Sequence, residues 1–428
     1  MTEPTLPLSG IRVLDFGHMV MGPSCGMVLA DLGADVIRIE PPEGDPTRKL
    51  PGFAQGFFGA FNRNKRSLAI DLKRPEGRAA LLRLVETADV LLENFGAGAM
   101  DRLGLGWEVL REANPRLIYL ALKGYLSGPY ENRGALDEVV QIQTGIAYMT
   151  GPPGQPLRAG ASIVDLMGAV FGVVGVQAAL RERDRTGVGQ RVSSSLFESG
   201  AFLVSTHIAG NAVTGTIMNP LPARTRAFGV YDSFDTRDGR RVFLSVTSDL
   251  QWPRFVAAMG IETIAADPRC ATNTTRAEAR DWLIPVLAEV VAGMDLDDIA
   301  SRCEAAKIPF APVQKPSDLL EDPHLLASGG LLETLLAPKG GDGPSAGIPA
   351  LPMEFGDDRR RLPLRRQPAR IGEHSRDVLV EAGLSAAEAE ALLALGVIRD
   401  HAAVSGNEHV RTDTGRKTGL EAVGPSGA

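Results

Sequence analysis

The residues best suited to chemistry lie in the segment from Gly160 to Gln190, which reads GASIVDLMGAVFGVVGVQAALRERDRTGVGQ. A single acid, Asp165, follows the apolar pair Ile163-Val164, and almost every residue from Leu166 to Leu180 is small or apolar. Two interpretations of this carboxylate are open on the segment alone. It is either an N-cap or first-turn aspartate, which is common at helix starts, or a functional carboxylate on a rigid platform.

The segment after Asp165 is predicted to be a helix with one bare face. Its glycines recur three or four residues apart, so another part of the chain can pack closely against that face. The arginines at its far end favour a helix C-terminus, because the helix dipole stabilises cations there. Residues 186–189 then end the helix, and residues 191–196 are predicted to be a strand. The glycines are Gly168, Gly172 and Gly175, and the arginines are Arg181, Arg183 and Arg185.

The N-terminal part of the chain alternates predicted strands and helices. Residues 11–16 and 35–40 are short apolar strands, and Ser24 can cap a helix between them that runs to Leu32. A strand, helix and strand at this spacing form a βαβ unit, and its repetition predicts a doubly wound α/β domain with a parallel sheet. Ligands of such sheets bind at the carboxyl ends of strands. Further strands are predicted at 67–72, 89–93 and 117–122, and candidate site loops at 17–23 and 41–48.

The length of 428 residues predicts more than one domain. An antiparallel pair at 230–234 and 241–246 indicates a smaller α+β domain in the middle of the chain. Six arginines between Asp358 and Arg370 are interpreted as a solvated or interface face, because prolines and aspartates interrupt them. The predicted order is a large α/β domain, N-terminal part (1–213), a linker (214–223), a small α+β domain (224–325), a return linker with the C-terminal part of the large domain (326–404), and a disordered tail (405–428).

Composition excludes several classes of protein. A net charge of −7 argues against a general nucleic-acid or anionic-membrane binder. Three separated cysteines and six scattered histidines indicate neither a disulfide framework nor a metal site. No GxGxxG follows the first strand, and no GxxxxGK[ST] occurs. The start MTEPTLPLSG lacks signal-peptide features, and the apolar run after Asp165 is expected to be too short to span a bilayer, so a cytoplasmic protein is expected.

Taken together, seven stretches resemble the class III CoA-transferases, the family of formyl-CoA:oxalate and carnitine CoA-transferases. No single stretch is specific, but the combination is, and the match covers nearly the whole chain to about residue 400. The matching stretches are LSGIRVLDF (8–16), GP (22–23), LGADVIRIEPPEGDPTR (32–48), NRNKRSLAIDLKRPEG (62–77), ENFGAGAMDRLGLGW (93–107), NPRLIYLALKGY (114–125), and the Asp165 helix with TGVGQ (186–190).

The resemblance implies an unusual fold and a covalent mechanism. The N- and C-terminal parts would form one Rossmann-like domain, the middle a small domain, and linkers would close each chain into a ring that interlocks with a second ring as a homodimer. Asp165 would attack a donor acyl-CoA to give a mixed anhydride, and CoA thiolate would convert this into an aspartyl-CoA thioester before the acceptor acid takes over the CoA. Backbone N–H groups near the helix start would suit the developing oxyanion. Acyl-CoA and a small carboxylic acid are then the substrates, and no cofactor is bound permanently.

The resemblance also assigns residues to the CoA and acyl site. Lys73 and Arg102 can pair with phosphate groups of CoA. Formyl-CoA transferases carry glutamine and alanine where this chain has Val20 and Met21, and an arginine where it has Pro41. Their glycine-rich flap is also absent between 219 and 252, so oxalate or formate is not expected as a substrate. The assigned positions are Val20, Met21, Ile70, Asp71, Leu72, Lys73, Asn94, Phe95, Gly96, Arg102, Leu136 and Asp137.

Two rival functions remain. The α-methylacyl-CoA racemases share this fold and the aspartate, but they need a proton-transferring histidine where this chain has Leu136, which cannot carry a proton. A non-catalytic CoA or acyl-CoA binding protein would not need the intact Asp165. Within the transferases, the apolar residues Val20, Met21 and Leu136 favour a C4–C6 dicarboxylate such as succinate, a methylated relative of it, or a larger monoacid. Arg48 or Arg133 is a candidate to hold a second carboxylate, by charge.

Overall fold

The protein, seen in a computed structural model that describes residues 6–223, 227–336 and 343–401, divides into two compact units. Within those residues, the first unit holds 6–147, 157–209 and 329–401, and the second holds 148–156 and 210–328. The sequence-based boundaries placed 148–156 in the large domain and 214–223 in a linker, whereas the structure groups both with the middle of the chain. Helices α7 (Ile146–Thr150) and α10 (Ser205–Thr214) run across these borders. The tail predicted at 405–428 lies outside the described residues.

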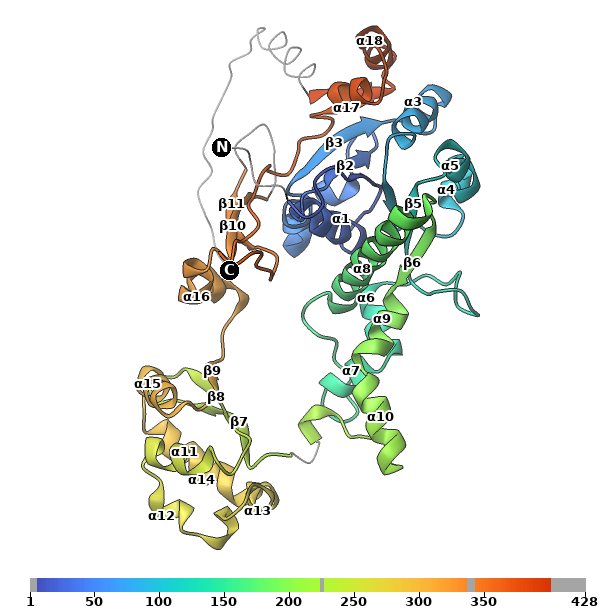
Figure 1. The fold of residues 1–428 in the computed structure, drawn as a ribbon. Helices are drawn as coiled ribbons and strands as arrows, with labels where there is room; N and C mark the ends of the chain where they lie inside the picture. Colours follow the sequence, from blue (N-terminus) through green and yellow to red (C-terminus); the bar gives the residue numbers. More distant parts are fainter. Residues whose placement is uncertain (1–5, 224–226, 337–342, 402–428) are drawn as a thin grey trace, which may run out of the picture. The chain divides into compact units, whose positions relative to one another are not determined.

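A seven-stranded sheet forms the centre of the first unit, with the strand order β12-β3-β2-β1-β4-β5-β6. Strands β2, β3, β5 and β6 of this sheet are labelled in Figure 1. Every neighbouring pair is parallel except β12 with β3. The predicted parallel α/β sheet is therefore confirmed, with the direction of winding changing between β1 and β4. Ligands of doubly wound sheets bind at such a switch point. The strands are β1 (Arg12–Asp15), β2 (Asp35–Glu40), β3 (Lys65–Ile70), β4 (Val90–Glu93), β5 (Ile118–Lys123), β6 (Arg191–Ser195) and β12 (Ile398–Arg399).

Helices cover both faces of this sheet. Successive strand residues point to opposite faces, so Leu92 packs with α1 and α8, whereas Leu91 packs with α3, α5 and α17. The buried cores on the two faces make the sheet the rigid layer that positions the loops at its carboxyl edge. The helices of this unit, besides the two named above, are α1 (Met21–Asp31), α2 (Phe57–Phe61), α3 (Pro75–Val85), α4 (Ala99–Arg102), α5 (Trp107–Ala113), α6 (Asp137–Gln143), α8 (Ile163–Thr186), α9 (Leu196–Leu203), α17 (Ser375–Glu381) and α18 (Ala386–Ala394).

Helix α8 is the helix predicted after Asp165. A Cβ on Gly168 would lie 2.4 Å from the Met21 Cε atom, and one on Gly172 would lie 2.8 Å from Leu122 Cδ2, so side chains of α1 and β5 fill the bare face. By length and composition alone, this 24-residue helix could cross a membrane. The expectation that the apolar segment is too short to span a bilayer is therefore wrong. Its buried residues nevertheless pack in the core of the first unit.

Helix α1 begins earlier than the sequence indicates. It starts at Met21, so Ser24 is an interior residue whose hydroxyl donates to the Val20 carbonyl, and the predicted Ser24 cap is wrong. The reason is that Pro23 lies in the first turn, where proline is tolerated, so it does not delay the helix.

The C-terminal segment completes the edge of the large sheet. The Ser67 hydroxyl accepts a hydrogen bond from Gly372 N (2.9 Å), and the Ser67 carbonyl accepts one from His374 N (3.1 Å). The backbone of the arginine-rich segment packs against the first unit, because Asn64 Oδ1 accepts from the backbone N–H groups of Arg365 (2.6 Å) and Arg366 (2.8 Å), while both side chains are exposed. A separate hairpin precedes it, formed by β10 (Leu331–Leu335) and β11 (Ser345–Pro349).

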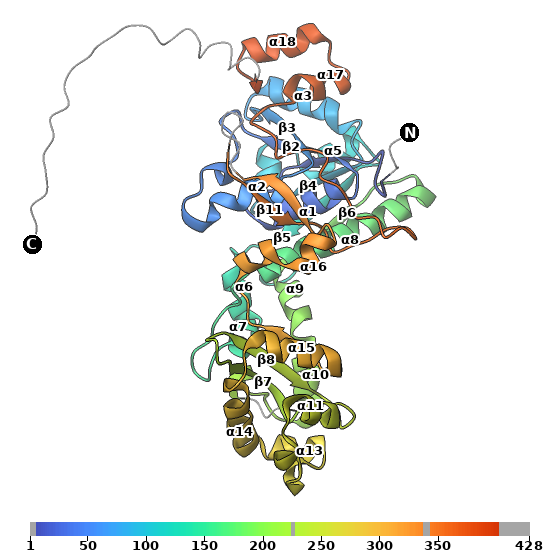
Figure 2. The same cartoon turned by 90° about the vertical axis from the view of Figure 1, so that its left-hand side faces the viewer.

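The second unit contains a three-stranded antiparallel sheet in the order β7-β8-β9, with helices packed around it (Figure 2). The predicted hairpin is confirmed, with Asp235 opposite Arg241 at its turn. Phe255, Leu283 and Ile299 are buried in its core. Its strands are β7 (Val230–Asp235), β8 (Arg241–Val246) and β9 (Phe310–Pro312), and its helices are α11 (Trp252–Met259), α12 (Glu262–Ala265), α13 (Asn273–Glu278), α14 (Arg280–Ala292), α15 (Leu296–Ala306) and α16 (Pro323–Ala327).

Candidate active site

A pocket of about 1020 Å³ lies at the carboxyl edge of the large sheet. Its wall is built from residues that follow three neighbouring strands: His18 after β1, residues 94–99 after β4 and residues 124–127 after β5. The segment 131–135, just before α6, closes another side. The pocket therefore occupies the switch point of the sheet, where the fold predicts a ligand.

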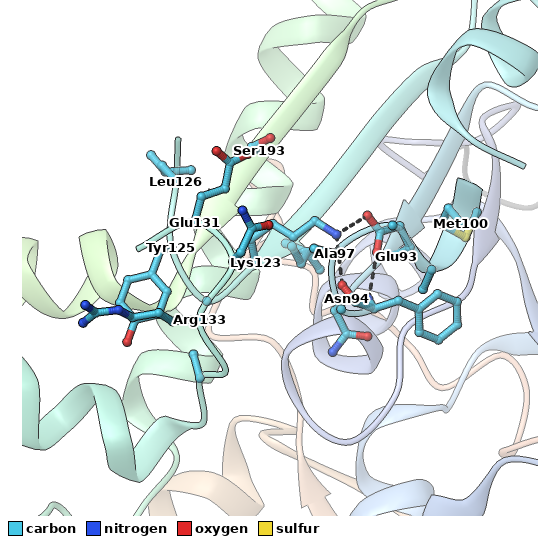
Figure 3. Close-up of a pocket in the computed structure, with 18 of the residues that line it drawn as sticks. Glu93, Asn94, Ala97, Met100, Lys123, Tyr125, Leu126, Glu131, Arg133 and Ser193 are labelled. Atoms are coloured by element: carbon cyan, nitrogen blue, oxygen red, sulfur yellow. Dashed lines mark hydrogen bonds and ion pairs between the residues drawn. The ribbon is translucent and has the colours of Figure 1, made fainter. Parts of the chain in front are cut away.

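A partly buried ion pair fixes the pocket wall after β4. The Glu93 carboxylate accepts hydrogen bonds from Lys123 Nζ (2.6 Å), Tyr119 Oη (3.1 Å) and Phe95 N (2.7 Å). Lys123 Nζ also donates to the Phe95 carbonyl (3.0 Å), and Figure 3 shows the Lys123 and Glu93 side chains pointing toward one another. Burial and the adjacent Glu93 charge raise the pKa of the Tyr119 hydroxyl. Lys123 therefore neutralises Glu93 and holds the loop in place.

His18 is a pocket residue that the sequence reading missed. The Asn94 side chain brackets its backbone, accepting from His18 N (2.8 Å) and donating to the His18 carbonyl (3.0 Å), and the imidazole stacks on Phe95 at 5.6 Å. Burial is the main cause that lowers the pKa of His18, so the ring is neutral at pH 7. The available signal was a histidine two positions after the predicted strand 11–16, within the predicted site loop 17–23.

Buried cations anchor both ends of the loop that carries His18. Lys65 Nζ donates to Asp15 (2.7 Å) at the end of β1 and to the Pro23 carbonyl (2.8 Å) in α1. The Arg38 guanidinium donates to the Gly17 carbonyl. Both ends of the loop are thus tied to one polar network, which keeps the pocket wall pre-organised.

Asp165 lies in the first turn of α8 and is partly buried. Burial, the Asp137 charge and the Glu138 charge raise the pKa of Asp165 to about 7. A carboxyl group that holds its proton near neutral pH is a more basic, and so a better, nucleophile than an exposed aspartate. Its raised pKa thus distinguishes Asp165 from an exposed first-turn aspartate, but Asp165 is not among the residues that line the pocket. Ser162, at the cap position of α8, makes no side-chain cap bond.

The cap of α8 comes from another helix. Asp137 Oδ2 accepts hydrogen bonds from Val164 N (3.0 Å) and Asp165 N (3.3 Å), while Ile163 N donates to the Ala161 carbonyl (2.9 Å). These contacts occupy the N–H groups that we expected to stabilise an oxyanion. That expectation is wrong for this conformation, because a buried carboxylate from α6 already satisfies the orphan donors of the helix start.

Only some of the residues assigned to CoA line the pocket. Asn94, Phe95 and Gly96 lie on its wall, and Arg102 lies beside that loop with its guanidinium donating to the Ala97 carbonyl (3.3 Å). The remaining assigned residues are absent from the pocket wall: Val20, Met21 and Ile70 are buried in the core, Asp71, Leu72 and Lys73 form the turn after β3, and Asp137 is buried against α8.

The residues proposed for substrate selection differ in their availability. Arg48 is committed to Glu40, which it contacts at 2.6 and 2.8 Å, and it also lies over the Phe58 ring. Arg133 is exposed on the pocket wall and lies 3.9 Å above the Tyr130 ring. Leu136 is 65% exposed and is not part of that wall. Arg133 is thus the better candidate for a second carboxylate.

The described part of the chain holds no group of three histidine, cysteine, aspartate or glutamate residues that could bind a metal ion. Its cysteines, Cys25, Cys270 and Cys303, are all free and buried.

Comparison with known proteins identifies the class to which this fold and pocket belong. The family model for CoA-transferase family III matches residues 8–375. The chain is 34% identical over 390 residues to the succinate–glutarate CoA-transferase of Agrobacterium fabrum, covering 88% of this chain and 95% of that protein. It is also 34% identical over 332 residues to the succinyl-CoA–D-citramalate CoA-transferase of Chloroflexus aurantiacus, covering 76% and 83%.

Among solved structures, a CAIB/BAIF family protein from Brucella suis matches with a TM-score of 0.78 and 30% identity, covering 89% of this chain and all of that one. The chain therefore belongs to CoA-transferase family III, and the resemblance found in its sequence is confirmed. It is a CoA-transferase enzyme, whose substrates are a CoA thioester and a carboxylic acid.

Proposed function

We propose that this enzyme transfers CoA between two carboxylic acids through covalent intermediates on Asp165. One observation carries the proposal: Asp165, in the first turn of α8, is a partly buried carboxyl group whose pKa is raised to about 7, although it is not among the residues that line the pocket. A structural cap would not need a raised pKa, because caps act as exposed or hydrogen-bonded anions.

The proposed reaction balances at each step. The Asp165 carboxylate attacks the thioester carbonyl of the donor, forming a mixed anhydride and expelling CoA as the thiolate. The thiolate attacks the aspartyl carbonyl, which releases the donor acid and leaves an aspartyl-CoA thioester. The acceptor carboxylate attacks that carbonyl and expels the thiolate again, giving a second anhydride. Finally the thiolate attacks the acceptor's acyl carbon, forming the new acyl-CoA and restoring Asp165.

Partial burial serves this chemistry in two ways. It raises the basicity of the carboxylate, which favours attack on the thioester. It also limits the access of water, which would otherwise hydrolyse the anhydride and thioester. Because the pKa is raised only to about 7, the carboxylate form remains accessible at neutral pH.

We infer that the acids exchanged are C4–C6 dicarboxylates. Two relatives at 34% identity are named for succinate, glutarate, succinyl-CoA and citramalate. Arg133 supports this class, because its guanidinium is exposed on the pocket wall and its stacking on Tyr130 fixes its direction. A guanidinium can bind the free carboxylate of a dicarboxylate in a bidentate manner. The loop 94–96 is then assigned to the CoA side of the pocket, with Arg102 beside it near the phosphates. Lys73, which lies in the turn after β3 and not on the pocket wall, is proposed as a phosphate contact from the family resemblance alone.

We also propose a cytoplasmic location. Three free cysteines fit a reducing compartment.

The direct kinetic test compares two aspartates of the same helix. Asp165→Asn removes the nucleophile and is expected to lower kcat for succinyl-CoA with glutarate by at least about a thousandfold, in keeping with the loss of a group that acts covalently. Asp184→Asn changes an exposed aspartate near the other end of α8 and should leave kcat unchanged. Full activity of an Asp165→Asn preparation shown by mass spectrometry to be free of deamidation would refute the mechanism.

A further inference from the structure

Asp137 joins the start of α6 to the start of α8. It is 4% exposed, and its two carboxylate oxygens have different partners. Oδ2 accepts from the first-turn N–H groups of Val164 and Asp165, whereas Oδ1 accepts from the Gln141 amide and lies 3.7 Å from the Arg158 guanidinium. One of the bonded N–H groups thus belongs to the proposed nucleophile itself.

We propose that Asp137 is a positioning residue for the reaction, because its carboxylate caps α8 from a neighbouring helix and holds a second negative charge beside Asp165. The proposal rests on the proposed function of Asp165. A serine or asparagine cap would satisfy the same N–H groups without adding charge. A buried aspartate at this position therefore also places a negative charge beside Asp165, which capping alone does not require.

Gln141 makes this arrangement rigid. Its side-chain carbonyl accepts from Ala159 N (2.9 Å) while its amide donates to Asp137, and the residue is fully buried. The segment that leads into α8 is therefore tied to α6 at the same place as the cap. This double attachment fixes the backbone of Asp165 relative to α6.

The charges around Asp165 come mainly from α6. Asp137 and the exposed Glu138 both raise the pKa of Asp165, after the larger effect of burial. Arg158 lies 3.7 Å from the Asp137 carboxylate and 3.3 Å from the Glu138 carboxylate, so we expect it to offset part of their charge. The other elements packed against α8 also carry charged or titratable groups. These are Glu198 of α9, bonded to Ser195 and Leu126 N; Tyr119 and Lys123 of β5, both bonded to Glu93; Arg191 of β6; and Cys25 and Asp31 of α1, of which Asp31 is bonded to Arg63.

Asp137 therefore has a predicted kinetic signature. A neighbouring anion disfavours ionisation of Asp165, so the enzyme should gain activity only as the pH rises through about 7. Removing the Asp137 charge while keeping an acceptor for the cap should move that rise to lower pH. A purely structural cap would not shift it.

The experiment measures kcat/KM for succinyl-CoA between pH 5 and 9 in matched variants. Asp137→Asn keeps a carbonyl oxygen for the helix cap, and its rise in activity should move down by about one pH unit. Activity at pH 5.5, relative to each enzyme's own plateau, should then increase about tenfold. Glu138→Gln removes a weaker, exposed charge and should give a smaller shift in the same direction. Arg158→Gln removes the compensating cation and should shift the rise to higher pH.

These outcomes separate the positioning role from the nucleophile assignment. Unchanged profiles in folded Asp137→Asn and Arg158→Gln enzymes, together with an inactive Asp165→Asn, would overturn the role of Asp137 alone. An active Asp165→Asn enzyme would instead overturn the proposed function. If Asp137→Asn fails to fold, the opposite shifts expected for Glu138→Gln and Arg158→Gln still decide, because shifts in one direction, or none, would contradict the proposal.

Discussion

The Asp165 carboxyl group gains reactivity at a cost in folding stability. Its pKa rises from 3.8 to about 7 on folding, so the folded protein holds a proton that the unfolded chain releases. Stability therefore falls as the pH rises from about 4 to 7, and the full penalty is present above pH 7. Each unit by which the folded-state pKa exceeds the unfolded-state pKa lowers the free energy of unfolding above pH 7 by about 1.4 kcal/mol.

This cost predicts that Asp165→Asn stabilises the protein while abolishing transfer. The gain in melting temperature over the natural protein should be small at pH 5 and largest at pH 8, because only the natural side chain must ionise there. Thermal unfolding of both proteins at the two pH values measures this difference. A gain that is equal at both pH values, or a loss of stability at pH 8, would contradict the raised pKa and favour the cap interpretation.

Arg133 gives a second test at the level of one residue. A charged hydrogen bond is worth about 1.5–3 kcal/mol, so Arg133→Gln should weaken the use of succinate or glutarate by about ten- to a hundredfold, chiefly through KM. A monocarboxylate acceptor with the same chain length is the internal control and should be affected little. Equal losses for both acids would assign Arg133 a role other than binding the second carboxylate.

At the scale of elements, the sequence indicated α8 correctly but not its surroundings. The spacing of Gly168 and Gly172 predicted close packing, and Gly187 ends the helix with a left-handed backbone (φ 76°). The cap of α8 by Asp137 could not be predicted from the sequence, because Asp137 and Val164 are 27 positions apart and meet only through tertiary structure. The buried cations Arg38 and Lys65 lie in strands, so their contacts with the His18 loop also depended on the fold.

The turn between α8 and β6 contains Gly189, and we predict that adding a methyl group there lowers the stability of the fold. A Cβ on Gly189 would lie 2.1 Å from the Leu117 carbonyl oxygen and 2.5 Å from the Arg116 carbonyl carbon, and backbone atoms cannot move aside easily. Gly189→Ala should therefore cost about 1–3 kcal/mol or more, as overpacking does. Gly56→Ala, where no atom lies within 4 Å, is the matched control. Urea unfolding curves that coincide for both variants would show that this close approach is absent.

At the scale of the whole molecule, the chain leaves and re-enters the first unit. The described residues of that unit come from three separate segments, and β12 at the C-terminal end pairs with β3 near the N-terminal end. The repeated strand and helix pattern allowed the central sheet to be predicted. A strand of only two residues, β12, carries too little pattern to be found in the sequence.

We propose from this return of the chain that the enzyme is a homodimer of interlocked rings, as the family resemblance implies. Such a dimer cannot separate without unfolding, so it should keep its mass on dilution to nanomolar concentration. Sedimentation velocity over a wide concentration range measures this directly. A monomer that appears reversibly as the protein is diluted would contradict the interlocked arrangement.

The most direct measurement of the central claim is the site at which the acyl group or CoA becomes attached. Tryptic cleavage after Arg158 and Arg181 releases the peptide 159–181, in which Asp165 is the only acidic side chain. The enzyme is incubated with succinyl-CoA, trapped with hydroxylamine or borohydride, digested and analysed by mass spectrometry, with Asp165→Asn treated in parallel. We predict a mass change on peptide 159–181 of the natural enzyme and none in the variant. Modification of a different peptide, or turnover without any trapped adduct on this one, would contradict Asp165 as the nucleophile.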